Sequence, residues 1–236
     1  MEQIGLLHDG QIYDLQTAEA LNIKGDIIKA DDSKESLEIL RHSCAHMMAQ
    51  AIKELYPEAK FFVGPVVKEG FYYDFKVESK ISDEDLPTIE KKMKEIADRK
   101  LPITRHETTK EEFYEKFKND ELKQAVLKNI KDDTLTIYKQ GDFEDLCRGP
   151  HLPNTRMIRS FKLTRVAGAY LGGDEKNEMI TRIYGIAFFD KQALFDYTKM
   201  IEEAKKRDHR KLGTELELFT FNDDVGAGLP MWLPNG

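Results

Sequence analysis

The sequence predicts an α+β protein in which antiparallel sheets pack with helices. Stretches with helical periodicity and short alternating strands are intermixed along the 236 residues, without the regular βαβ units that build a parallel sheet. Hydrophobic residues make up 40% of the chain and charged residues 33%, which is typical of a soluble globular protein with a sizeable core. No apolar run is long enough to span a membrane, and two cysteines without an export signal predict a cytoplasmic, reducing location.

The first 31 residues are expected to form a small β unit. Two alternating segments, Ile4–Leu7 and Ile12–Leu15, flank the dipeptide Asp9–Gly10, which favours a tight hairpin turn. Asp26–Ile28 is expected to add a third strand. We call residues 1–31 the N-terminal unit.

A long helix is predicted next. Asp32 or Ser33 can cap its start with Glu35 in a capping box, and Pro57 ends it. Apolar residues recur at steps of three and four, as on a helix that faces a core. These residues are Leu37, Leu40, Cys44, Met47, Ala51 and Leu55.

The remaining elements follow from alternation, caps and breaks. Strands are expected at 61–63, 71–77, 102–108, 134–140, 161–171 and 179–188. Helices are expected to begin at Ser82, Thr109, Glu121 and Asp190, the last one running to Gly213. The strand at 134–140 is expected to lead into Cys147–His151, which we call the CRGPH loop.

Two short clusters contain half of the chain's histidines and cysteines. His42 and His46 are one helical turn apart and project from the same side of the long helix. Cys147 and His151 are also four residues apart, but Gly149 between them predicts a loop. Either pair alone is more often a coincidence or a hydrogen-bonded core residue. Together they favour a zinc site or a hydrolytic site.

The charge distribution qualifies the net charge of −7, which by itself argues against a nucleic-acid partner. Residues 146–173 contain no acidic residue, and their position at the CRGPH loop favours phosphate contacts. The basic residues there are Arg148, Arg156, Arg159, Lys162 and Arg165. A second basic cluster, which can equally be a solvated face, is Lys205, Lys206, Arg207, Arg210 and Lys211.

Longer blocks carry a resemblance to threonyl-tRNA synthetases, in their N-terminal editing region. The blocks are RHSCAH (41–46), GPVVKEGFYYDF (64–75), DLCRGPH (145–151), FKLTRVAGAYLGGD (161–174) and KKRDHRKLG (205–213). They occur in the family's order from about Ser33 to the last residue. The His and Cys pairs alone would also fit the related alanyl-tRNA editing domains, and the longer blocks select the threonyl family.

The resemblance implies a domain organisation. Residues 1–31 would be an abbreviated β-grasp-like unit, because the family's own β-grasp domain is longer than this space. Residues 32–189 would be the editing domain of the threonyl/alanyl-tRNA type, and 190–213 a linker helix. Residues 214–236 would be the start of a truncated catalytic domain.

The resemblance also implies a function. The whole protein would be a threonine–tRNA ligase, which joins threonine to tRNA(Thr) using ATP. This chain would hydrolyse mischarged seryl-tRNA(Thr) by attack of water on the aminoacyl ester. Such proofreading is needed because serine lacks one methyl of threonine, a difference of roughly 1–3 kcal/mol in a binding pocket.

Roles follow residue by residue from the matched blocks. His42 would orient or deprotonate water, and Lys123 would orient water or stabilise the oxyanion, unless it is an ordinary surface lysine. Asp145 would anchor the substrate amine or ribose, while Cys147 and His151 would line the pocket without covalent catalysis. The catalytic set is thus His42, Lys123, Asp145, Cys147 and His151. The substrate-binding set is His46, Gly64, Tyr73 and Arg148.

No metal is expected in the editing site, because an ammonium at Lys123 and a divalent cation would repel each other. The alternative is a zinc ion on His42, His46, Cys147 and His151. ATP, Mg and a catalytic zinc are expected only in the missing catalytic domain. The expected partners are tRNA(Thr) carrying serine, the rest of the synthetase chain and a second copy in a homodimer, with no membrane. Alternative functions are a zinc-stabilised tRNA-binding module and a freestanding trans-editing deacylase.

Overall fold

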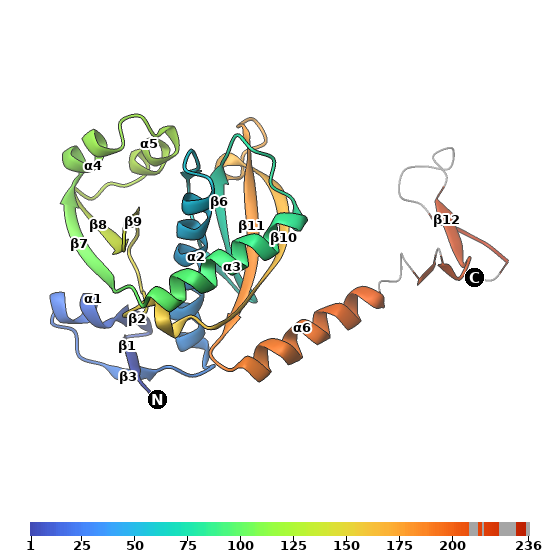
Figure 1. The fold of residues 1–236 in the computed structure, drawn as a ribbon, viewed down its shortest axis with the longest axis horizontal. Coiled ribbons are helices and arrows are strands. Elements are labelled where there is room, and N and C mark those ends of the chain that lie inside the picture. The colour runs from blue at the N-terminus through green and yellow to red at the C-terminus, as the bar shows by residue number, and fades with distance from the viewer. Residues whose placement is uncertain (208–211, 214, 222–229, 235–236) are drawn as a thin grey trace. The chain divides into compact units, whose positions relative to one another are not determined.

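The computed structural model describes residues 1–207, 212–213, 215–221 and 230–234. They form two compact units, Met1–Lys191 and Gln192–Gly236. The first unit is an α+β assembly of three antiparallel sheets with helices, as the sequence predicts (Figure 1). Among the described residues, no helix combines the length and the apolar character that crossing a bilayer requires.

The N-terminal unit forms a three-stranded sheet of order β2-β1-β3. Its strands are β1 (Gln3–His8), β2 (Gln11–Asp14) and β3 (Asp26–Lys29). The predicted hairpin is confirmed, with Asp9 and Gly10 both at positive φ, as a tight two-residue turn requires. The predicted second strand is wrong at its end. Asp14 accepts a hydrogen bond from the Thr17 N–H and caps a short helix, α1 (Leu15–Ala20).

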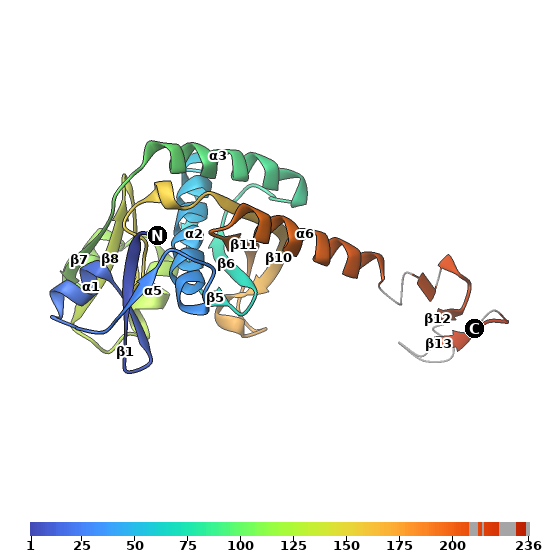
Figure 2. The ribbon, with the colours of Figure 1, turned by 90° about the horizontal axis from the view of Figure 1, so that it is seen from below.

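Helix α2 (Lys34–Leu55) is the central element of the first unit. It lies between the β7–β8–β9 sheet and the sheet that contains β6, β10 and β11 (Figure 2). Its predicted apolar residues are buried except Leu55, which is partly buried. The predicted capping box is wrong, because the Ser33 side chain makes no capping hydrogen bond. Asp32 instead accepts hydrogen bonds from the N–H groups of Phe189 and Asp190.

A five-stranded antiparallel sheet packs on α2. Its order is β10-β11-β6-β4, with β5 paired to β6. The strands are β4 (Lys60–Phe61), β5 (Val66–Val67), β6 (Gly70–Lys76), β10 (Ser160–Tyr170) and β11 (Met179–Phe188). A 3-10 turn, η1 (Asp83–Asp85), leads into α3 (Leu86–Arg99), which packs on α2 and β10. The buried residues shared by these elements form one hydrophobic cluster, the main core.

The remaining part of the first unit has a core of its own. It contains β7 (Ile103–Thr109), α4 (Lys110–Lys116), α5 (Glu121–Lys128), β8 (Thr134–Gln140) and β9 (Phe143–Leu146). The strand order is β7-β8-β9. Its buried apolar residues, the small core, are Phe113, Leu127, Leu135 and Ile137. Between β8 and the CRGPH loop the chain forms a hairpin and returns through β9, a strand that was not predicted from the sequence.

Beyond the CRGPH loop the chain forms two 3-10 turns, η2 (Thr155–Met157) and η3 (Leu171–Gly173). The second unit contains most of α6 (Lys191–Lys206) and an antiparallel pair, β12 (Phe219–Phe221) and β13 (Pro230–Trp232). Part of the predicted helix 190–213 and part of 214–236, with Arg210 and Lys211 of the second basic cluster, lie outside the described residues. The domain boundaries drawn from the resemblance stay predictions.

Candidate active site

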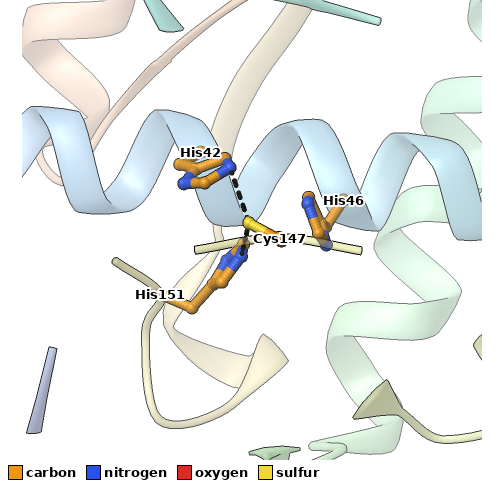
Figure 3. A group of neighbouring side chains, drawn as sticks. All are labelled: His42, His46, Cys147 and His151. Atoms are coloured by element: carbon orange, nitrogen blue, oxygen red, sulfur yellow. Dashed lines mark hydrogen bonds between the residues drawn. The ribbon is translucent and has the colours of Figure 1, made fainter. Parts of the chain in front are cut away.

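Four side chains from the two predicted clusters meet in the first unit. His42 and His46 project from α2 toward Cys147 and His151 of the CRGPH loop (Figure 3). One potential ligand atom from each of the four lies within 4.8 Å of all the others. The helix supplies two imidazoles at fixed spacing, and the loop supplies the thiol and the third imidazole.

The hydrogen bonds of His42 define its protonation. Nδ1 lies 3.2 Å from the carbonyl oxygen of Pro150, and a carbonyl can only accept, so Nδ1 carries the proton. Nε2 therefore presents a lone pair, and it lies 3.2 Å from Sγ of Cys147. The imidazole faces the site with its basic nitrogen.

His151 is oriented in the same way by Ser43. The Ser43 hydroxyl donates to the carbonyl of Ile39 at 2.9 Å, so its oxygen accepts from Nδ1 of His151 at 3.3 Å. Nε2 of His151 is then also unprotonated, and it lies 3.2 Å from Sγ of Cys147. Two imidazole lone pairs therefore converge on a thiol that has one proton to donate.

Burial dominates the acid–base properties of the four groups. It lowers the pKa of His42 to about 4 and the pKa values of His46 and His151 well below their ordinary range, because the charged imidazolium loses hydration. The charges of neighbouring histidines lower the pKa values of His46 and His151 further. Burial also raises the pKa of the Cys147 thiol. At neutral pH the site holds neutral imidazoles and a protonated thiol.

His46 has a different environment from the other two histidines. It is 4% exposed and its ring packs against the rings of His151, Tyr73 and Phe143. Neither of its ring nitrogens has a hydrogen-bond partner among the described residues. No hydrogen bond among the described residues fixes its tautomer, and the wall-shaping role that the resemblance implies for His46 stays a prediction.

Lys123 and Asp145 form a buried pair beside these histidines. Lys123 on α5 donates from Nζ to Oδ1 of Asp145 on β9, and the Tyr73 hydroxyl donates to Oδ2. Lys123 is 4% exposed, so it is not the surface lysine that the sequence left open. Burial lowers the pKa of Lys123 to about 8 and raises the pKa of Asp145, since both charged forms lose hydration.

Gly64 leaves room for the ring of Tyr73, whose hydroxyl donates to Asp145. A Cβ at Gly64 would lie 2.3 Å from Cδ2 of Tyr73. Any side chain at this position would therefore clash with the tyrosine ring and displace its hydroxyl from Asp145.

Arg148 is placed differently from the other predicted site residues. Its side chain is largely exposed and pairs with Asp132 at 3.0 Å. Both residues line a cavity of about 260 Å³ that Cys147 also borders.

Four of the five basic residues of segment 146–173 already have acidic partners. Arg148 pairs with Asp132, and the other pairs are Arg156 with Glu2, Arg159 with Asp98 and Lys162 with Glu90. Arg165 lies over the ring of Tyr184 at 4.1 Å. A phosphate that contacts the paired groups would therefore have to compete with a carboxylate.

The chemistry of the donor set fits zinc. In a tetrahedral site, neighbouring nitrogen and sulfur ligands lie roughly 3.3–3.6 Å apart, close to the 3.2 Å from Cys147 Sγ to each Nε2. His42 and His151 also have the outer hydrogen bonds that orient zinc ligands. His46 lacks such a partner among the described residues. These residues would hold the ion, which would supply Lewis acidity toward water.

Sequence reasoning missed three residues that hold the site. Ser43 lies within the RHSCAH block, and its hydroxyl also accepts from the Leu152 N–H at 2.8 Å. Asp14 accepts hydrogen bonds from the His151 N–H at 3.0 Å and from the Tyr138 hydroxyl at 2.6 Å. The signal for Asp14 is its place before a short helix, and the signal for Tyr138 is an inward position on a predicted strand.

Comparison with known proteins places the chain among the aminoacyl-tRNA synthetases. Residues 135–184, which include β9 and the CRGPH loop, match the threonyl and alanyl tRNA synthetase second additional domain. The chain is 66% identical over 235 residues to a threonine–tRNA ligase of Campylobacter jejuni, covering all of this chain and 39% of that protein. It is 65% identical to threonine–tRNA ligases of Helicobacter hepaticus, over 235 residues, and Nautilia profundicola, over 234.

The chain belongs to the threonine–tRNA ligase family. It spans 39% of the length of the Campylobacter and Helicobacter relatives and 38% of the Nautilia relative.

Proposed function

We propose that this chain hydrolyses the ester of seryl-tRNA(Thr). The observation that carries the proposal is the enclosed lone pair at Nε2 of His42, fixed by the Nδ1 contact with Pro150. A base must be unprotonated before it can accept a proton from water. Burial, which lowers the pKa of His42 to about 4, keeps it in that form at neutral pH.

In the proposed reaction, a water oxygen attacks the ester carbonyl carbon and its proton goes to Nε2 of His42. The bond between that carbon and the ribose oxygen of the terminal adenosine then breaks. The ribose oxygen takes that proton from Nε2 of His42, which returns the imidazole to its neutral form, and serine and tRNA(Thr) leave. Lys123 in its ammonium form would stabilise the oxyanion, with Asp145 and Tyr73 holding it in place.

Direct attack by water is favoured over a covalent intermediate on Cys147. Burial raises the pKa of the Cys147 thiol, so the thiolate that would act as nucleophile is scarce at neutral pH. Cys147 then acts as a wall and hydrogen-bond partner. His151, His46, Gly64 and Arg148 would complete the binding site around the aminoacyl ester.

Further proposals follow for the whole protein. It would ligate threonine to tRNA(Thr), with ATP, Mg and a catalytic zinc bound by the rest of the ligase chain. It would act in the cytoplasm as a homodimer. In that setting the site would remove serine from tRNA(Thr), because a second pocket can exclude threonine by its extra methyl group.

The proposal is tested by incubating the purified chain with seryl-tRNA(Thr) and, separately, threonyl-tRNA(Thr). Release of serine much faster than of threonine is the expected result. Equal rates would contradict the discrimination by size. Absence of serine release from a folded chain would overturn the hydrolytic function.

A second candidate is a zinc-stabilised tRNA-binding module without hydrolysis. The observation that favours it is the approach of four ligand atoms to within 4.8 Å of one another. A chain with one zinc that binds tRNA(Thr) but leaves the seryl ester intact would support this candidate.

A further inference from the structure

The carboxylate of Asp14 belongs to the N-terminal unit but is buried against the CRGPH loop. The residue is 1% exposed, and Oδ1 accepts the Thr17 N–H at 2.7 Å. Oδ2 accepts both the Tyr138 hydroxyl at 2.6 Å and the His151 N–H at 3.0 Å. A buried carboxylate is costly unless its lone pairs are satisfied, and these three donors satisfy it.

The main chain of the CRGPH loop packs closely against this carboxylate at Gly149. Gly149 has φ of 77°, and a Cβ there would lie 2.8 Å from Oδ2 of Asp14 and 2.6 Å from the Tyr138 hydroxyl. A side chain at this position would therefore displace the loop. Leu152, on the far side of His151, is held separately by Ser43.

Each end of His151 is thus held by a different part of the protein. Its imidazole is oriented through Nδ1 by Ser43 on α2, and its main chain is held by Asp14. An imidazole stays aimed at Sγ of Cys147 only if its own Cα is fixed. Hydrolytic rates are sensitive to such placement, since a shift of about 1 Å can cost about 10²-fold.

We propose that Asp14 is a positioning residue of the hydrolytic site. Its carboxylate fixes the main chain at His151 and thereby the direction of the imidazole toward Cys147 and His42. The inference rests on the proposed hydrolysis of seryl-tRNA(Thr), and it gives the N-terminal unit a part in that reaction.

Positioning of His151 by Asp14 can be distinguished from simple attachment of the N-terminal unit to the rest of the protein, because Gln16 provides a matched control. Gln16, on α1, donates from Nε2 to the carbonyl of Ile103 at 2.6 Å and accepts the Arg105 N–H at 2.8 Å. These two hydrogen bonds attach the N-terminal unit to β7 without touching the loop. Gln16→Ala removes these two hydrogen bonds and none of those that Asp14 accepts.

The test compares Asp14→Asn with Gln16→Ala in the full 236-residue chain. Asparagine keeps the shape and can still cap α1, but its NH₂ group would face the His151 N–H, donor against donor. Single-turnover deacylation of seryl-tRNA(Thr), with the chain in excess, gives a plateau rate and a half-saturating concentration. We expect Asp14→Asn to lower the plateau about tenfold or more and change half-saturation by less than about twofold. Gln16→Ala should change both by less than about twofold.

Hydrogen exchange at residues 147–152 provides a readout that does not depend on activity. Asp14→Asn should exchange faster there than the wild type, whereas Gln16→Ala should not. If the wild-type chain releases no serine, the proposed function fails, and unchanged exchange in Asp14→Asn would then overturn the positioning role as well. An unchanged plateau rate in Asp14→Asn, or an equal loss in Gln16→Ala, also overturns it. Should Asp14→Asn not fold, Asp14→Ser, which retains a capping oxygen, is measured in its place.

Discussion

Nε2 of His42 lies 3.2 Å from Sγ of Cys147, so the basic nitrogen of the resting site faces a thiol. The thiol is a weak donor, and a neutral imidazole gives up such a bond at little cost. In the proposed hydrolysis, water would therefore replace Cys147 as the hydrogen-bond partner of His42. The resting contact keeps the imidazole aimed at the site without consuming its basicity.

Replacing His42 or Lys123 with alanine should lower the rate of seryl-tRNA(Thr) hydrolysis by about 10²-fold or more, the scale of a lost base or oxyanion donor. The measurement is the single-turnover rate constant, with circular dichroism to confirm folding. His106→Ala is the control, because His106 is exposed on β7 and bonds only to Thr104 among the described residues. A folded His42→Ala chain that keeps the wild-type rate would refute water activation by His42.

The metal-free chain should lose stability as the pH falls from about 6.5 to about 4. The pKa of His42 is lowered to about 4 by burial, so between these values the unfolded state binds more protons than the folded state. A shift of this size corresponds to about 3 kcal/mol at most, and His46 and His151 shift in the same direction. Urea unfolding at several pH values, after chelator treatment, measures the effect.

The matched variant for this pH series is His42→Gln, which cannot titrate. Its free energy of unfolding should depend less on pH in this window than that of the wild type. A parallel pH dependence for both chains would show that His42 does not contribute.

Ser43→Ala should lower the free energy of unfolding by about 1–3 kcal/mol, because the buried Leu152 N–H and Nδ1 of His151 would lose their acceptor. Ser33→Ala, at the start of the same helix, is the control. The Ser33 side chain makes no capping hydrogen bond, so its loss should change stability by less than about 0.5 kcal/mol. Thermal and urea melts of both variants check the difference, and equal losses would contradict the assigned role of Ser43.

The purified chain is expected to contain no stoichiometric metal and to keep its hydrolytic rate in a chelator. The reason is the position of Lys123, whose ammonium form would be repelled by a divalent cation in the same site. Elemental analysis and deacylation assays with and without chelator decide the question. One zinc per chain, lost together with activity, would assign His42, His46, Cys147 and His151 as ligands.

Local chemistry made much of the fold predictable. The Asp9–Gly10 hairpin and the helix start at Thr109 each depend on neighbouring residues, and both occur as expected. The four-residue cluster was also predictable, because each pair has its own spacing and the residue types of the two pairs together favour one site, although His42 and Cys147 are 105 residues apart. The Asp14 contacts were not, because Tyr138 and His151 lie 124 and 137 residues away and no combination of residue types links them to a lone aspartate.

The first unit has two cores, and residues of the candidate site stand on both of them, so a substitution in one core can alter the site without changing any site residue. His42 and His46 stand on a helix of the main core, whereas Lys123 stands on α5, which packs on the small core. Substitution of a small-core residue such as Phe113 would shift the lysine and leave both histidines in place. The proposed proofreading would then be weakened while every residue of the site remains intact, and a comparison restricted to site residues would overlook such a loss.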